Sequence, residues 1–233
     1  MIGKLVRTNL IIGVRDYAYP IYLLIALAYG LMLLAFPREY LATMVPLFLF
    51  LEPGLVGFMF VGTEIFAEKK DGAIGALAVT PMEWRDYIMA KTLLLGGISV
   101  AGAALILTVG TRSLDGIPYV LAGSFLVSIV YTLLGIGISA KYRDLDDYFV
   151  PIIGVMVVSL LPFAHSHGYL TGEIWKVLYL IPSYPALYFF KAPFEEISTE
   201  TLLLSGLALL AWSALAYHIA RTRFYRYAVE GLR

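Results

Sequence analysis

Residues 118–140 read PYVLAGSFLVSIVYTLLGIGISA, and they decide the class of this fold because the stretch contains no charged side chain over 23 positions. A helix rises ~1.5 Å per residue, so a run of this length can cross the ~30 Å hydrocarbon core of a bilayer. Lipid offers no partner to backbone N–H and C=O groups, and a helix satisfies these groups internally. The stretch therefore predicts a membrane-spanning helix.

The composition of the whole chain agrees with this prediction. Of the 233 residues, 60% are hydrophobic and only 15% are charged. A soluble domain carries about a quarter of charged residues to cover its surface, so we expect an integral membrane protein surrounded by membrane lipid. The chain has no cysteine and a formal net charge of zero. Disulfides and thiolate metal sites are therefore excluded, and no nucleic-acid partner is expected.

Six apolar runs predict six spanning helices in a single all-α membrane domain. We expect the spans at residues 18–36, 41–66, 88–110, 118–140, 148–164 and 200–220. The chain then divides into residues 1–17, residues 18–66 with spans one and two, residues 67–87, residues 88–164 with spans three to five, residues 165–199, residues 200–220 with span six, and residues 221–233.

The basic residues of the connecting segments predict the orientation, because Lys and Arg accumulate on the cytoplasmic side of membrane proteins. With both termini in the cytoplasm, thirteen basic residues lie inside: Lys4, Arg7, Arg15, Lys69, Lys70, Arg85, Lys91, Lys141, Arg143, Arg221, Arg223, Arg226 and Arg233. Four lie outside: Arg38, Arg112, Lys176 and Lys191. We therefore expect a multi-pass protein of the cell membrane with both termini cytoplasmic, including a tail at residues 221–233.

The first 16 residues, MIGKLVRTNLIIGVRD, have the pattern of a helix in the membrane interface. One helical face carries Lys4, Arg7, Thr8 and Arg15, and the opposite face carries Ile2, Val6 and Leu10. A helix with one charged and one apolar face lies along the membrane surface. The alternative is an ordinary cytoplasmic start of the first span.

Residues 165–199, on the outer side before the last span, contain two apolar stretches, WKVLYLI and ALYFF, that are too short to cross a membrane. Pro182, Pro185 and Pro193 interrupt the segment. Short broken runs of this kind are typical of re-entrant or interfacial helices.

Residues 64–91, EIFAEKKDGAIGALAVTPMEWRDYIMAK, form the inner segment between spans two and three and contain two helix-start signals. Asp71 with Gly72 can cap a short helix, AIGALAV, in which Ile74 and Leu77 fall on one side. The sequence TPME at residues 80–83 has the spacing of a capping box, with proline at the first helical position. This predicts that the next helix begins there and continues into span three. A solvated loop that only reverses the chain is the alternative.

The combination AEKKDGAIGALAVTP, between the second and third of six spans, resembles the membrane subunit of the ABC-2 type transporters, whose members export drugs, antibiotics, polysaccharides and lipids. The residues that match the corresponding loop of that family are Glu68, Lys69, Gly72, Leu77, Thr80 and Pro81. Ala73, Ile74 and Gly75 stand where the family often has Thr-Leu-Glu, so the acidic residue of that segment is absent. The resemblance covers the whole chain in layout.

The resemblance implies a permease subunit that pairs with an identical or related permease and binds a separate cytoplasmic ATPase through a coupling helix in this loop. The implied coupling residues are Glu68, Lys69, Lys70, Asp71, Gly72, Ile74, Leu77, Thr80 and Pro81. The sequence has no G-x-x-x-x-G-K-[ST] phosphate loop, so we expect no cofactor on this chain, and ATP and Mg on the partner ATPase. The implied cargo is an amphipathic or lipophilic molecule.

Glu52 is the most unusual residue of the predicted spans. It lies roughly 18 Å along a helix from Tyr40, near the bilayer midplane, where an ionisable group costs at least ~2.5 kcal/mol. Pro53 and Gly54 follow it and predict a kink. Two interpretations stay open. Either Glu52 and Pro53 lie in a substrate pathway, or Glu52 is protonated or bonded to freed backbone or to a hydroxyl such as that of Tyr131.

Two other classes of function compete with an ATP-driven exporter. Interior prolines in spans two and five are weak signs of the repeats of an ion-coupled secondary transporter or channel, with Glu52 in its pathway. An intramembrane enzyme would need a catalytic constellation, and the nearest motif, GISVA at residues 97–101, lacks the final glycine of a serine-hydrolase elbow. His165 and His167 have no clear third ligand, so no metal site is expected.

Overall fold

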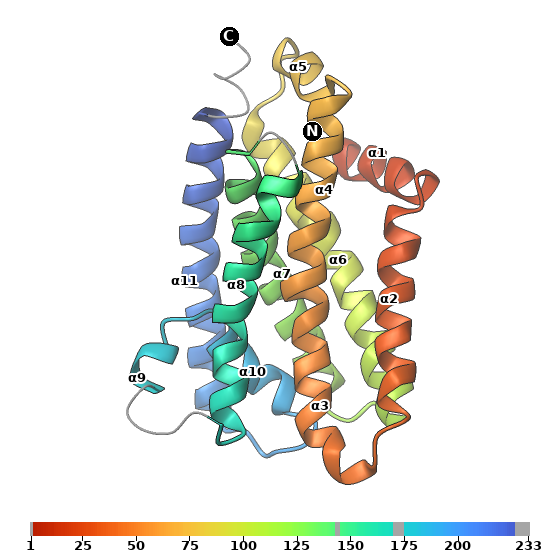
Figure 1. The fold of residues 1–233 in the computed structure, drawn as a ribbon, viewed down its shortest axis with the longest axis vertical. Helices are drawn as coiled ribbons and strands as arrows, with labels where there is room; N and C mark the ends of the chain where they lie inside the picture. Colours follow the sequence, from red (N-terminus) through yellow and green to blue (C-terminus); the bar gives the residue numbers. More distant parts are fainter. Residues whose placement is uncertain (1, 143–144, 170–174, 227–233) are drawn as a thin grey trace.

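Long helices run side by side along one axis of the protein, and shorter helices lie at both ends (Figure 1). The computed structural model describes residues 2–142, 145–169 and 175–226. In chain order the helices are α1 (Ile2–Arg15), α2 (Ala18–Leu33), α3 (Arg38–Phe50), the π-helix η1 (Leu51–Val56), α4 (Gly57–Lys70), α5 (Ala73–Ala78), α6 (Trp84–Thr111), α7 (Ile117–Ser139), α8 (Leu145–Ser166), α9 (Trp175–Leu178), α10 (Ser183–Lys191) and α11 (Thr199–Phe224). The prediction of an all-α fold is confirmed.

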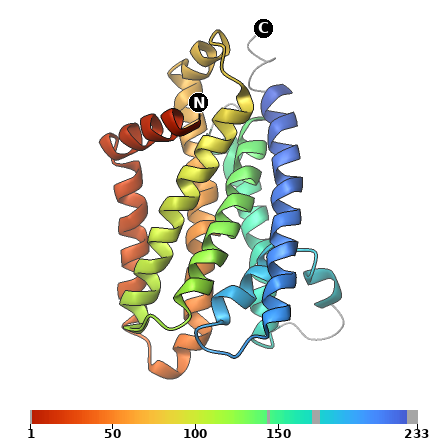
Figure 2. The ribbon, with the colours of Figure 1, turned by 180° about the vertical axis from the view of Figure 1, so that it is seen from behind.

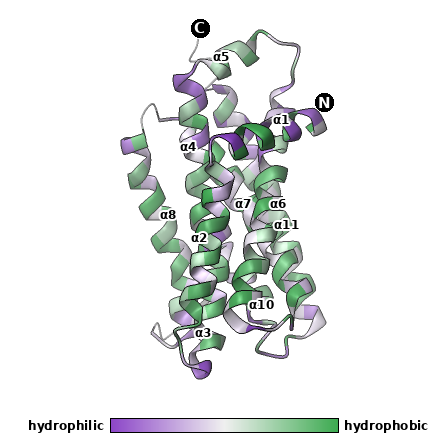
Figure 3. Cartoon of the chain, turned by 90° about the vertical axis from the view of Figure 1, so that its right-hand side faces the viewer, coloured by the Kyte–Doolittle hydropathy of each residue, from purple (hydrophilic) through white to green (hydrophobic). Residues whose placement is uncertain are grey.

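The predicted spans correspond to these helices. Five stretches are long and apolar enough to cross a membrane: Arg38–Lys70, Trp84–Thr111, Ile117–Ser139, Leu145–Ser166 and Thr199–Phe224. Helix α2 has only 16 residues, and it completes a sixth span when it is counted with α1, to which it is bent by 71°. Hydrophobic residues cover the middle of the long helices, and hydrophilic residues gather towards the ends (Figure 3). The chain is a multi-pass membrane protein.

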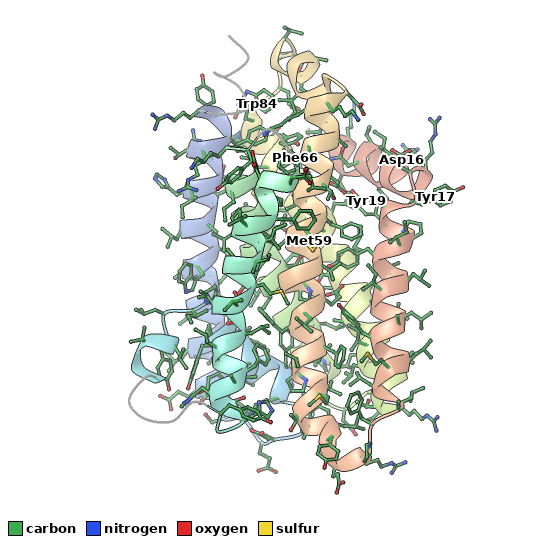
Figure 4. All side chains as sticks on the ribbon, in the orientation of Figure 1. Asp16, Tyr17, Tyr19, Met59, Phe66 and Trp84 are labelled. Atoms are coloured by element: carbon green, nitrogen blue, oxygen red, sulfur yellow. The ribbon has the colours of Figure 1, made fainter. Side chains whose placement is uncertain are left out.

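Helix α1 lies across the bundle, as expected for an interfacial helix (Figures 1 and 2). The corner between α1 and α2 is at Tyr17, which has a positive φ of 61°. Figure 4 shows Tyr19 just beyond this corner. Its ring covers Gly13, where an added Cβ would lie 2.2 Å from a ring atom. Val6 packs against the bundle, whereas Leu10, on the predicted apolar face, is 41% exposed. The close contact at Gly13 holds α1 against α2.

Helix α7 occupies the centre of the bundle and depends on small residues for close contacts. An added Cβ at Gly135 would lie 2.5 Å from Val61 on α4, and one at Gly123 would lie 2.5 Å from Phe189 on α10. At Gly137 the backbone of Ala220 on α11 would be 3.2 Å away. Glycine therefore lets three neighbouring helices approach α7.

The two ends of the bundle differ. Helices α1 and α5 and the start of α6 lie at one end, called here the α5 end, and α9 and α10 lie at the other, the α10 end (Figure 1). Helix α10 turns back into the bundle and buries Phe190, in agreement with a re-entrant helix. The basic residues predicted inside lie at the α5 end, except Arg143 and Arg233, which are outside the described residues together with the rest of 227–233.

Candidate coupling site at the α5 end and a buried carboxylate in the bundle

The loop between α4 and α6 contains the predicted short helix, but its turns are built differently from the prediction. Gly72 begins α5 with a positive φ of 72°, and the side chain of Asp71 makes no capping bond. Helix α6 begins at Trp84, with Glu83 in the extended N-cap position. The Thr80 hydroxyl donates to the carbonyl of Leu77 at 2.7 Å and closes the end of α5. The predicted capping box at residues 80–83 is therefore wrong, because its threonine ends one helix instead of starting the next.

One face of α5 packs onto the bundle. Ile74 is 2% exposed and belongs to the same core cluster as Ile65 of α4 and Ile88 of α6. Leu77 packs against that cluster one turn later. The prediction that both residues share one side is confirmed. This side faces the bundle, where Ile74 is buried and Leu77 is half-buried, and the part of both residues in coupling stays a prediction.

The opposite surface of the loop is exposed. Five of the predicted coupling residues lie there: Lys70, Asp71, Gly72, Thr80 and Pro81. Val79 lies among them and is 88% exposed, a position that the sequence reasoning missed. A β-branched apolar residue directly before Thr-Pro in a loop is the signal that could have identified it.

Glu68 points into the bundle, where it joins a buried charge cluster. The ammonium of Lys91, 2% exposed on α6, lies 2.8 Å from a carboxylate oxygen of Glu64 and 2.8 Å from one of Glu68. The Tyr87 hydroxyl donates to the second oxygen of Glu68. Glu64 and Glu68 are one turn apart on α4, so both reach the same lysine. The cluster joins α4 to α6 at the two ends of the α5 loop.

Lys69, the neighbouring residue, also points inward. Its ammonium donates to the carbonyls of Ser139 at 2.9 Å, Ala140 at 3.1 Å and Tyr142 at 2.9 Å, and it lies 5.2 Å from the centre of the Phe66 ring. The last carbonyls of a helix have no partner within the helix and carry partial negative charge. Lys69 therefore caps the end of α7 and joins α4 to it.

The second candidate, Glu52, lies fully buried within η1 (0% exposed). One carboxylate oxygen accepts from the Ser99 hydroxyl of α6 at 3.0 Å. The other has no hydrogen-bond partner among the described residues and lies where a Cβ on Gly102 would be 2.2 Å away. The Tyr22 hydroxyl of α2 donates to the backbone carbonyl of Glu52 at 3.3 Å. Glu52 therefore lies where α2, η1 and α6 meet.

The predicted kink takes the form of the π-helix itself. Residues Leu51–Val56 form π turns around Pro53, and single π turns of this kind occur at functional sites. Tyr131 does not reach Glu52, because its hydroxyl bonds to Ser159 at 2.8 Å. The hydroxyl partner is Ser99. Neither Glu52 nor Pro53 is exposed in this single chain, and their place in a substrate pathway stays a prediction.

A family model described as the fluoroquinolones export permease protein family matches residues 2–232. The chain belongs to this family. Two similar proteins are fluoroquinolones export permease proteins of Mycobacterium tuberculosis, from the strains CDC 1551 / Oshkosh and H37Rv. Each is 30% identical over 151 residues, which cover 62% of this chain and 60% of the relative.

Membership in the fluoroquinolones export permease family confirms the resemblance to exporter permeases. In this family member the charged residues of the loop separate into two groups. Glu68 and Lys69 bond to other helices, and Lys70 and Asp71 are exposed. No group of three possible metal ligands occurs in the described part of the chain.

Proposed function

We propose that this chain is the membrane-spanning permease subunit of an ATP-driven exporter in the cell membrane. The observation that carries the proposal is the position of α5 at one end of the bundle, directly after Glu68 and Lys69 of α4, which bond to α6 and α7. A force on α5 would reach three spans through Lys69, Lys91 and the core contact of Ile74. Such an arrangement suits a permease that is moved by an external motor.

In this proposal the α5 end and both termini are cytoplasmic, since most basic side chains of the described segments gather there. A separate ATPase subunit binds ATP and Mg and docks on the exposed surface around Val79. The permease works as a pair, formed with an identical chain or with a related one. The pathway would then lie between the two permeases.

The proposed cargo is a drug of the fluoroquinolone kind, and more generally an amphipathic or lipophilic molecule. The names of the family and of the two mycobacterial relatives support this class of substrate.

Co-expression of the tagged chain with the ATPase encoded beside it tests the proposal. We expect the ATPase to copurify, and inverted membrane vesicles to take up a fluoroquinolone only when ATP is supplied. Vesicles in which the ATPase cannot hydrolyse ATP serve as the control. Failure to recover an ATPase, together with uptake that survives ATP depletion, would contradict the proposal.

An ion-coupled secondary transporter is the second candidate, because Glu52 is a buried carboxylate with one unbonded oxygen beside π turns. Uptake driven by an ion gradient without ATP, and abolished by Glu52→Gln, would favour this candidate. It leaves the exposed α5 loop without a role, so we rank it second.

A further inference from the structure

A cavity of about 720 Å³ lies between the start of α6 and the end of α11, at the α5 end of the bundle. Residues that line it include Trp84 and Arg85 from α6 and His218, Arg221 and Tyr225 from α11 and its end. Figure 4 shows Trp84 at this end. The ring of Trp84 packs on Phe224, with the ring centres 5.5 Å apart, so one wall of the cavity is fixed.

The charge of the cavity favours an anion. Among the described residues that line it are the guanidinium groups of Arg85, Arg221 and Arg226 and the carboxylate of Glu83. Glu83 is already bonded to Arg85, at 2.6 Å. Arg221 has no carboxylate within salt-bridge distance in the segments that the structure describes. Arginine matches the oxygens of a phosphate group with paired N–H donors.

The cavity lies at the level of the lipid headgroups in the membrane. Helices α6 and α11 have 28 and 26 residues, more than the about 20 that cross the hydrocarbon core. Their ends therefore reach the headgroup region, where Trp and Tyr are favoured. In α11 the apolar sequence ends at Ala220, directly before Arg221.

A continuous stripe on α11 leads from the membrane to the cavity. Leu203, Leu207, Leu210, Ala214, His218 and Arg221 follow each other at three- and four-residue spacing, which places them on one helix face. All six are exposed, and the three leucines by 53% or more. The stripe offers an apolar track for an acyl chain with a basic group at its end.

We propose that this cavity binds the phosphate of an anionic phospholipid, with an acyl chain along the α11 stripe. The site adjoins the α5 loop, since Glu83 at the end of that loop lines it, and it is separate from Glu52. It requires only that the chain lies in a bilayer. Basic pockets between spanning helices at the headgroup level bind anionic lipids in other membrane proteins.

Native mass spectrometry of the purified full-length chain, with phosphatidylglycerol or phosphatidylcholine added, tests the proposal. We expect the chain to retain phosphatidylglycerol in preference to phosphatidylcholine. In Arg221→Gln the retention of phosphatidylglycerol should fall about fivefold, because one basic residue near an anionic headgroup strengthens binding by about that factor. The control is Arg223→Gln, which removes the same charge from α11 outside the cavity and should retain the lipid. Circular dichroism verifies that both variants are folded.

Two further probes separate a lipid from a free anion. Millimolar inorganic phosphate should leave phosphatidylglycerol bound, and glycerophosphoglycerol, which has the headgroup without acyl chains, should be retained much more weakly. Displacement by inorganic phosphate would overturn the lipid assignment. Equal loss in the two arginine variants, or equal retention of the two lipids, would overturn the site itself.

Discussion

Glu52 and Glu68 lie on one continuous helical stretch, α3–η1–α4, yet their surroundings differ. Glu68 and Glu64 both contact the ammonium of Lys91. Glu52 instead accepts a hydrogen bond from Ser99, and its other oxygen lies against Gly102. A buried carboxylate is expensive unless a cation or several donors compensate it. The cluster of Glu64, Glu68 and Lys91 is therefore suited to hold α4 and α6 together permanently. Glu52 has no cation beside it among the described residues, and its surroundings favour the neutral form of the acid.

The largest effect should follow from breaking the paired site with Lys91→Met. This change leaves two carboxylates facing each other in the protein, and loss of one partner of a buried pair costs about 3–5 kcal/mol. We expect a marked fall in the thermal unfolding midpoint of the detergent-purified chain. Lys70→Met, at an exposed position at the end of α4 two residues after Glu68, is the matched control and should leave the midpoint unchanged.

A rescue experiment identifies the cause. Adding Glu64→Gln and Glu68→Gln to Lys91→Met removes the charges that were left unpaired, so most of the lost stability should return. If the triple variant is no more stable than the single one, the cluster does not act as an ionic joint. Charge reversal at Glu68 alone would destabilise the chain in the same way, and so it cannot test coupling cleanly.

The unpaired site can be broken sterically with Gly102→Ala. The new Cβ would lie 2.2 Å from the carboxylate oxygen of Glu52 and 3.3 Å from Ala26, and overpacking of this kind costs about 1–3 kcal/mol. The control is Gly97→Ala on the same helix, where nothing lies within 4 Å. It should be neutral or stabilising, since alanine favours a helix. Equal midpoints for the two variants would show that Glu52 moves away without cost.

The sequence predicted the spans, the short helix and the shared side of Ile74 and Leu77, because apolar periodicity is a property of neighbouring residues along the chain. It did not predict that this side faces inward. It did not predict that Lys91 pairs with Glu64 and Glu68, since the partners lie 27 and 23 positions away. The i, i+4 spacing of the two glutamates was a visible signal. Thr80 was misassigned because a hydroxyl next to proline can close the preceding helix as well as open the next one.

A substitution on the outer face of the α5 loop should change the binding of the ATPase rather than the stability of the chain. We expect Val79→Asp to lower the recovery of a copurifying ATPase about tenfold, because a charge replaces an exposed apolar contact. The thermal midpoint should stay within the change of an ordinary surface substitution, about 0.5 kcal/mol. Thr8→Asp adds the same charge on exposed α1 and should not reduce recovery. Undiminished recovery with Val79→Asp would move the docking surface elsewhere.

Only a small change in stability is expected for Glu52→Gln. Glutamine keeps the shape of the neutral acid and its oxygen can still accept from Ser99, so the unfolding free energy should change by less than about 1.5 kcal/mol. Glutamine cannot take up or release a proton or pair with a cation, and fluoroquinolone uptake into vesicles should therefore fall while the permease still assembles. If uptake of every tested substrate is unchanged, Glu52 serves only to pack η1 against α6, and the contrast between the two acidic sites is one of structure alone.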